Sequence, residues 1–356
     1  MSSDYGYANA RIRALKSVLL SGEDYDRLIA ATSADALIEA LLRTAYKPDV
    51  EAALVRYHGV RCLTDAVRRN VTRTVGSLRR FFDARARELI ELLLARWDLF
   101  NVIAILRGQS RGVATDEILS VLVPAGMLTE AELCELAKQP TMQATGELML
   151  TWRLPFAGAV AEALRSSGGE LAHVERRLHQ IRFREAFSRL RSEPNDGMVR
   201  EMLVAEVDGL NLSLLVRLRP LRSHAMAGLV RSGADDVQAM LIAGGSLPLH
   251  LLLEIATTTD VDAMVGRLAG TPYGLALRQG LDDYEQRGEV AAFERALEKF
   301  LVRKGIHMFR RDPLTIAMAI GYLWAKTTEV ANLRLIAQGK ELGWQSDAIR
   351  NELTLV

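Results

Sequence analysis

Residues 98–118, DLFNVIAILRGQSRGVATDEI, align without a gap with residues 329–349, EVANLRLIAQGKELGWQSDAI, at a constant offset of 231 positions. Each stretch begins with an acidic residue that an asparagine follows three positions later, and its apolar residues recur at the spacing of one helix face. The pattern predicts an amphipathic helix that stops at the first glycine, a short turn, and a second helix that a Thr or Ser caps. The matched positions are Asp98 and Glu329, Asn101 and Asn332, Gly108 and Gly339, Gly112 and Gly343, and Thr115 and Ser346.

A third copy of the start of this pattern lies between the two stretches. Residues 207–217, VDGLNLSLLVR, match residues 97–107, WDLFNVIAILR, and supply another acid and asparagine, Asp208 and Asn211. Residues 8–16 look like a fourth, degraded copy. The sequence therefore predicts an internally repeated protein.

Three aromatic residues mark a second repeated position. Tyr46, Trp152 and Tyr273 each end a leucine-rich helical segment, directly or nearly after a threonine, and stand 52, 56 and 56 positions before the next acid of the repeat. Such a distance accommodates two helices of about 25 residues and a turn. We expect each unit to contain a segment of short helices followed by a long helical pair.

The chain reads as helical throughout. An apolar stripe that steps by three or four residues runs from Val60 to Phe82, and the alternation typical of strands is nowhere sustained. Proline and glycine breaks, such as Pro124 and Gly126, separate the helical segments. The sequence predicts an all-α protein of three similar helical-bundle units with pseudo-threefold symmetry. The expected units are residues 1–97, 98–207 and 208–328, and a closing segment, 329–356, repeats the start of a unit.

Composition and charge exclude several classes of protein. The 356 residues carry 45 Lys and Arg against 44 Asp and Glu, so no overall field attracts the chain to nucleic acid or anionic lipid. The best apolar stretch, residues 314–325, is shorter than the about 20 residues of a membrane span and is expected to form a buried core helix. The two cysteines form no CxxC pair and the N-terminus has no signal-peptide pattern, so we expect a cytoplasmic protein.

Sequence motifs of catalytic and cofactor sites are missing. The chain has no GxxxxGK[ST] phosphate-binding loop and no GxSxG nucleophile motif, and its six histidines include no HExxH pair. Neither cysteine has a neighbour at zinc-ligand spacing. We expect no enzyme activity, no catalytic residue, no cofactor and no metal ion.

The acid and asparagine pairs are candidates for an interaction or a structural role. Each pair shares one helix face with apolar neighbours, so we expect it to be half buried. One interpretation is that each pair hydrogen-bonds a neighbouring helix in its own unit, because a buried carboxylate without partners is costly. The other is that the three pairs face a common axis and hold a partner there. The candidates are Asp98, Asn101, Asp208, Asn211, Glu329 and Asn332.

Basic residues concentrate in two segments. Residues 56–87 hold nine arginines and two aspartates, and residues 173–191 hold six arginines and two glutamates. Each segment is either a solvated helix face or a docking surface for an acidic protein. Nucleic acid is disfavoured, because few aromatic residues that stack on bases lie between the arginines. The candidate contacts are Arg68, Arg69, Arg79 and Arg80.

The repeated signature resembles the C subunit of archaeal-type and bacterial V-type rotary ATPases, whose equivalent in the eukaryotic vacuolar enzyme is the d subunit. No stretch that carries the resemblance is a catalytic motif, and their order and spacing make it specific. These stretches span the chain and are YGYANARIRALK at 5–16, LLRTAY at 41–46, WDLFNVIAILRG at 97–108, VPAGML at 123–128 and EVANLRLIAQG at 329–339. The chain departs from the signature at residues 217–247 and at residues 148–153, which lack the Pro-Tyr found at 272–273.

The resemblance implies a funnel of three similar helical bundles that couples the central shaft of the ATPase to its membrane proteolipid ring. Such a chain would be a non-catalytic central-stalk rotor subunit that acts during ATP-driven ion transport or ATP synthesis. It would lie on the cytoplasmic face of the membrane, which it would contact only through the ring. Its partners would be the shaft subunits and the ring, without nucleic acid. The residues themselves leave open a generic helical adaptor that binds a peptide or nucleic acid on its basic helices.

Overall fold

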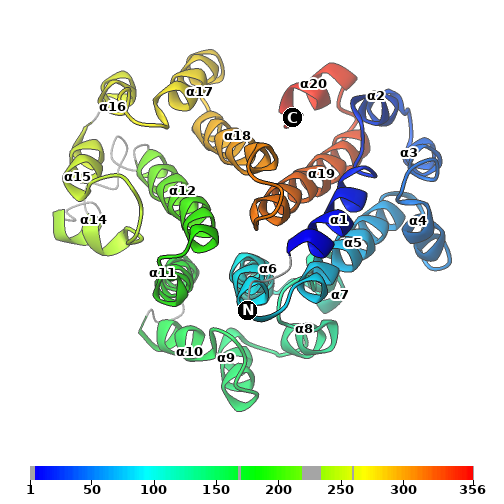
Figure 1. The fold of residues 1–356 in the computed structure, drawn as a ribbon, viewed down its shortest axis with the longest axis horizontal. Helices are drawn as coiled ribbons and strands as arrows, with labels where there is room; N and C mark the ends of the chain where they lie inside the picture. The colour runs from blue at the N-terminus through cyan, green and yellow to red at the C-terminus, as the bar shows by residue number, and fades with distance from the viewer. Residues whose placement is uncertain (1–4, 167–169, 219–233, 259, 356) are drawn as a thin grey trace. The chain divides into compact units, whose positions relative to one another are not determined.

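The computed structural model describes residues 5–166, 170–218, 234–258 and 260–355, and these residues form helices, turns and loops, with no strand among them (Figure 1). The predicted all-α class is confirmed for this part of the chain. Two compact units are present: Met1–Leu178 with Ile306–Val356, and His179–Gly305. The three-unit division and its threefold arrangement stay predictions, and residues 219–233 of the expected third unit lie outside the described residues.

The first unit joins the two ends of the chain. Its helices are α1 (Tyr5–Lys16), α2 (Gly22–Ala30), α3 (Ala34–Leu41), α4 (Lys47–Leu54), α5 (Gly59–Leu78), the 3-10 turn η1 (Arg79–Phe81), α6 (Ala84–Ser110), α7 (Thr115–Val121), α8 (Glu130–Ala137), α9 (Met142–Thr151), α10 (Ala157–Ser166), the first part of α11 (Leu171–Arg189), the 3-10 turn η2 (Met308–Arg310), α19 (Ala317–Glu341) and α20 (Ser346–Glu352).

The second unit holds the rest of the described chain. Its helices are the end of α11, α12 (Pro194–Arg217), α14 (Ala234–Met240), α15 (Leu249–Thr257), α16 (Val261–Arg267), α17 (Gly274–Arg287) and most of α18 (Ala291–His307). Its core combines side chains from α12, α15, α16, α17 and α18, among them Leu212, Leu252, Met264, Leu277 and Phe293.

Helix α5 lies at the centre of the first unit, where it packs against α4 and α19 (Figure 1). Its apolar stripe explains this position, because Leu63, Val67 and Val75 are all buried. The apolar stripe extends beyond the helix, however, because α5 ends at Leu78 and the buried Phe82 follows η1. The end of the predicted stripe therefore reaches the core from a loop and not from the helix.

Helix α19 is the second central element of this unit. Residues from Ala317 to Trp324 are buried, as expected for a core helix, but the helix begins three residues after Leu314. Lys326, which interrupts the apolar stretch in the sequence, is buried as well. Among the described residues, no helix combines the length and hydropathy needed to cross a membrane.

The two matched stretches end their first helix alike, but later than the pattern predicts. Helices α6 and α19 pass through Gly108 and Gly339 and stop two residues beyond each. A Cβ at Gly108 would lie 2.5 Å from the Ile118 side chain, so this glycine makes room for the following helix. The left-handed residues that terminate the helices are Gly112, with φ 65°, and Gly343, with φ 73°.

The expected helix caps are also displaced. Thr115 and Ser346 are the first residues of α7 and α20, and the cap positions before them, Ala114 and Gln345, make no side-chain cap hydrogen bond. The Ser346 hydroxyl instead donates to the carbonyl of Ile29, 3.1 Å away. Ser346 therefore ties α20 to the end of α2, which the local pattern could not indicate.

Candidate functional site

Asp98 lies in the middle of α6 and receives the loop that precedes α8. Its two carboxylate oxygens accept hydrogen bonds from the backbone N–H groups of Met127, at 2.8 Å, and Leu128, at 2.9 Å. The loop approaches closely because Gly126 has no side chain; a Cβ there would lie 2.1 Å from Asp98 Oδ1. Burial raises the pKa of Asp98, although the two N–H donors oppose that rise.

Asn101, one helical turn further along α6, holds the same loop nearer its start. Its side-chain N–H donates to the Val123 carbonyl and its side-chain oxygen accepts from the Val123 N–H, both at 2.7 Å. A primary amide satisfies a backbone donor and acceptor together because it carries both a carbonyl oxygen and an NH2 group. Asp98 and Asn101 thus form a clasp, by which we mean a buried acid and asparagine that bind the backbone of loops distant in the sequence.

The second unit contains a clasp on α12. Asp208 accepts hydrogen bonds from the backbone N–H groups of Ser246, at 3.0 Å, and Leu247, at 3.2 Å. Asn211 makes the paired amide contact with Ile242, at 2.9 and 2.8 Å. A Cβ at Gly245 would lie 2.2 Å from Asp208 Oδ1, so this glycine permits the same close approach as Gly126 in the first clasp. The same chemistry therefore recurs in both compact units.

The third clasp, on α19, joins the two ends of the chain. The N–H of Leu20 donates to Glu329 Oε2 at 2.6 Å, and the Tyr46 hydroxyl donates to Glu329 Oε1 at 2.7 Å. Asn332 pairs with the backbone of Thr354 at 3.0 and 3.1 Å. Glu329 thus binds residues of the expected first unit, which a within-unit hydrogen bond does not describe. Asn332 binds its own closing segment.

Glu329 also has a buried cationic partner that the sequence did not indicate. Lys326 Nζ contacts Glu329 Oε1 and lies 2.9 Å from the Tyr46 hydroxyl oxygen. Burial lowers the pKa of Lys326, while the charge of Glu329 acts in the opposite direction. Its position at i and i+3 with Glu329 was the available signal. A charged residue inside an apolar stretch is more simply interpreted as the end of that stretch.

Two of the three aromatic markers belong to the clasps. Tyr46 binds Glu329, and the hydroxyl of Tyr273 donates to Asp208 Oδ2 at 2.8 Å. Burial raises the pKa of both phenols, and the adjacent carboxylate adds to the rise. Trp152, the third marker, is 41% exposed. The two tyrosines therefore do not pair with the next acid along the chain, from which their spacing was measured.

The four candidate arginines have different surroundings. Arg68 pairs with Asp65 and Glu130, each at 2.9 Å, and Arg69 also contacts Asp65. The Arg79 guanidinium lies 3.0 Å from the Met127 sulfur. Arg80 is exposed on η1, and no ion pair with it is found among the described residues. Ion pairing within the chain thus neutralises much of the charge of Arg68 and Arg69.

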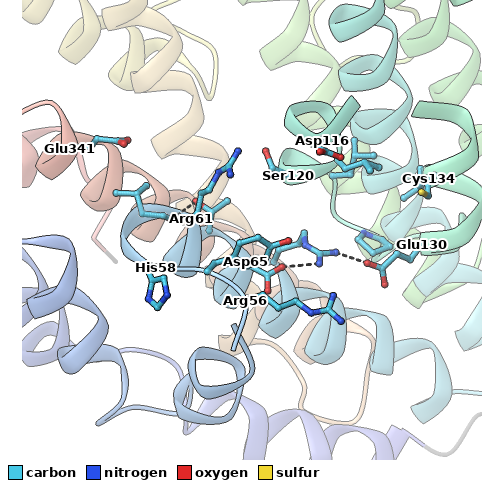
Figure 2. Close-up of a pocket in the computed structure, with 17 residues that line it drawn as sticks. Arg56, His58, Arg61, Asp65, Asp116, Ser120, Glu130, Cys134 and Glu341 are labelled. Carbon is cyan, nitrogen blue, oxygen red and sulfur yellow. Dashed lines mark hydrogen bonds and ion pairs between the residues drawn. The ribbon is translucent and has the colours of Figure 1, made fainter. Parts of the chain in front are cut away.

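A pocket of the first unit has walls of both charges (Figure 2). Its volume is about 790 Å³, and it lies between the start of α5, the segment from α7 to α8, and the end of α19. Arg56 and Arg61 stand on one side, and Asp116 and Glu341 come from the other elements. Because Arg68 is already paired across this pocket, the site offers no strong excess of either charge. In the described ranges, no group of three or more His, Cys, Asp or Glu side chains is placed to hold a metal ion.

Comparison with known proteins agrees with the repeated signature. The family described as ATP synthase (C/AC39) subunit matches residues 8–352. The C subunit of the A-type ATP synthase of Methanosarcina mazei is 29% identical over 359 residues, covering 100% of this chain and 94% of the relative. That of Haloquadratum walsbyi is 28% identical and covers 97% of both chains. That of Thermococcus kodakarensis is 25% identical and covers 95% of this chain and 88% of the relative. The chain therefore belongs to the ATP synthase (C/AC39) subunit family.

Proposed function

We propose that this chain is a non-catalytic central-stalk rotor subunit of an A/V-type ATPase, which couples the central shaft to the membrane proteolipid ring. Membership of the family supports a place in the ATP synthase complex, and the relatives are named as C subunits of A-type ATP synthases. The resemblance of the repeated signature and the buried hydrogen bonds of the clasps support the proposed coupling role.

The observation that carries the proposal is the recurrence of the clasp on α6, α12 and α19. A protein that transmits torque must resist deformation at the loops between its helices, because helices are stiff and loops yield first. In each clasp an asparagine fixes a loop residue through paired amide contacts. The acid accepts backbone N–H groups of the same loop on α6 and α12, and the N–H of Leu20 in a different loop on α19. These hydrogen bonds are at least partly buried, so solvent competes for them less than it does at the surface.

The proposed partners are the shaft subunits and the proteolipid ring, with membrane contact only through the ring. The proposal places the chain on the cytoplasmic face of the membrane, without a cofactor and without nucleic acid. The ion pairs of Arg68 and Arg69 favour this proposal over the helical adaptor, because they neutralise part of the surface that an adaptor would present to nucleic acid.

Affinity purification of the tagged full-length chain from gently solubilised membranes tests the proposal. The expected eluate contains shaft, proteolipid and nucleotide-binding subunits of one ATPase in constant ratio. An eluate of unrelated peptides or of RNA would favour the adaptor and contradict the rotor role. Calorimetric titration of the isolated chain with Mg-ATP checks the non-catalytic part, for which no discrete binding site is expected because no phosphate-binding loop is present in the sequence.

A further inference from the structure

A second pocket of the first unit lies between α1, α5 and η1, and its charges are one-sided. Its volume is about 450 Å³, and it is lined by Arg11 and Leu15 from α1, Arg73 from α5, and Arg80 and Phe81 from η1, with two hydroxyl side chains of α5 between them. No carboxylate lines it in the part of the chain that the structure describes. We call it the Arg11–Arg80 pocket.

The three arginines are not equally compensated. Arg73 donates to Asp49 at 2.6 Å, so one carboxylate outside the pocket balances it. Among the described residues Arg11 meets neutral groups: its guanidinium donates to the Tyr7 hydroxyl at 2.8 Å and lies over the Phe81 ring, 4.6 Å from its centre. Arg80 is exposed and has no ion pair among the described residues. Two positive charges therefore remain in the pocket without a counter-charge from the described part of the chain.

The surroundings reinforce this excess of positive charge. Helix α1 carries three basic residues, Arg11, Arg13 and Lys16, and no acidic residue. In the larger pocket of Figure 2, by contrast, arginines share the walls with Asp65, Asp116, Glu130 and Glu341. Arginine clusters on a protein surface are normally offset by neighbouring carboxylates, and one that is not offset attracts an anionic partner.

The chemistry of the walls restricts what this partner is. A guanidinium group binds a carboxylate through two parallel N–H donors, and that of Arg11 lies over the Phe81 ring. Leu15 and Phe81 add apolar surface beside the charges. A ligand that satisfies both features carries carboxylates next to an apolar side chain, which is the composition of an acidic polypeptide segment.

We propose that the Arg11–Arg80 pocket binds an acidic segment of another protein of the complex, with a carboxylate between the two arginines and an apolar side chain against Leu15 and Phe81. This assignment rests on the proposed function, because that function supplies the partner proteins. The pocket is distinct from the Arg68 and Arg69 pair, whose charges are already engaged by Asp65 and Glu130.

The test compares two double variants of the tagged full-length chain that remove the same charge. The pocket variant is Arg11→Gln with Arg80→Gln, and the control is Arg43→Gln with Arg111→Gln, two exposed arginines outside both pockets. Arg80→Gln alone is added because Arg11 also contacts Tyr7 and Phe81. Circular dichroism and the thermal midpoint verify that each variant folds.

Each variant is expressed in place of the wild-type chain, and the ATPase subunits that co-purify are washed with rising salt. We expect the pocket variant to release a partner protein about tenfold faster than wild type at low salt, with a smaller effect from Arg80→Gln alone. The difference shrinks at high salt, since screening weakens the wild-type contact. The control variant is expected to behave as wild type.

The outcomes separate the pocket from the function on which it rests. If wild type and the pocket variant retain the ATPase subunits equally, the pocket does not bind an acidic segment. The co-purified subunits would still support the rotor role. Equal loss in the pocket and control variants also overturns it, because general charge would then explain the effect. Absence of ATPase subunits from the wild-type eluate overturns the proposed function and the assigned partner together. Binding of the isolated wild-type chain to phosphatidylglycerol vesicles that needs Arg11 and Arg80, with unchanged subunit retention, overturns the polypeptide partner and reassigns the pocket to a lipid surface.

Discussion

The hydroxyl of Tyr46 lies 2.7 Å from Glu329 Oε1, although 283 positions separate the two residues along the chain. Lys326 Nζ lies 2.9 Å from the same hydroxyl oxygen, so the phenol donates to the anion and accepts from the cation. A single hydroxyl thereby satisfies two buried charged groups. This relationship makes the α19 clasp different from the other two, because no lysine among the described residues contacts the carboxylate of Asp98 or Asp208.

Tyr46→Phe removes that hydroxyl without changing the shape of the ring. The buried Lys326 and Glu329 each lose a hydrogen bond, and we expect the free energy of unfolding to fall by about 1–3 kcal/mol. Urea denaturation followed by circular dichroism measures the change. Tyr57→Phe, at a ring that is 37% exposed, is the control and is expected to alter stability by less than about 0.5 kcal/mol. Equal effects of both substitutions would show that the hydrogen bonds of the Tyr46 hydroxyl do not stabilise the fold.

Gly126→Ala tests the close approach of the loop to Asp98. The new methyl group would lie 2.1 Å from Asp98 Oδ1, so the carboxylate or the loop must move, and we expect a loss of about 2–4 kcal/mol. Gly245→Ala should have a comparable effect on the second unit, since its methyl group would lie 2.2 Å from Asp208 Oδ1.

The matched control for both glycines is Gly76→Ala near the end of α5, where no atom outside the local backbone lies within 4 Å of the added methyl group. Alanine has the better helix propensity, so this variant should be more stable than wild type by about 0.5–1 kcal/mol. Thermal unfolding compares the three variants. Stabilisation by Gly126→Ala would contradict the observed clasp geometry.

Asn101→Asp distinguishes a paired amide contact from a simple hydrogen bond. At neutral pH the carboxylate accepts from the Val123 N–H but repels the Val123 carbonyl, and we expect a loss of about 2–4 kcal/mol relative to wild type. A protonated carboxylic acid donates as the amide did, so the deficit should shrink below the pKa of the new acid. Unfolding free energies of both proteins across a range of about pH 4 to 8 measure this difference, with Asn351→Asp on the surface of α20 as the control. A deficit that is constant with pH would rule out the paired contact.

Asp98 should make stability fall as pH rises in the acidic range. Burial raises the pKa of this carboxyl above its ordinary value of 3.8, so the folded chain holds the proton to a higher pH than the unfolded chain. The contribution to the free energy of unfolding is then complete below pH 3.8 and is lost as pH rises through the folded pKa. A carboxyl-carbon NMR titration, with the resonance assigned through Asp98→Asn, measures the midpoint. A midpoint at or below 3.8 would contradict the burial effect.

The repeated pattern of acid and asparagine predicts where the clasps begin but not what they bind. The i and i+3 spacing places Asp98 and Asn101 on one helix face, and their neighbours indicate burial, because both properties are local. The partners are backbone groups of a loop 22 to 30 positions away. Because the contacts use the backbone of Val123 and Leu128, the side chains of these residues do not indicate them. Side-chain to backbone contacts are therefore the part of the site that local sequence reasoning misses.

Two predictions from local sequence, the helix stop at Gly108 and the end of the apolar stretch at Lys326, fail for the same physical reason. Gly108 looks like a helix stop because glycine often ends helices, but here it admits the side chain of Ile118. Lys326 looks like the end of an apolar stretch, but Glu329 and Tyr46 make its burial tolerable. In both cases a contact with another residue reverses a local preference. The arginines show the same effect, since Arg68 and Arg80 look alike in the sequence and differ only in their neighbours.

The Glu329 clasp becomes possible only late in the synthesis of the chain. At about 5–20 residues per second, residue 329 follows Tyr46 from the ribosome by roughly 15–60 s. During that interval the Leu20 amide and the Tyr46 hydroxyl have no native acceptor, and a nascent chain that ends early never supplies one. This clasp thus forms only after translation has reached α19. A protease that cleaves unsatisfied N-terminal segments would remove truncated chains before they compete for a place in the complex.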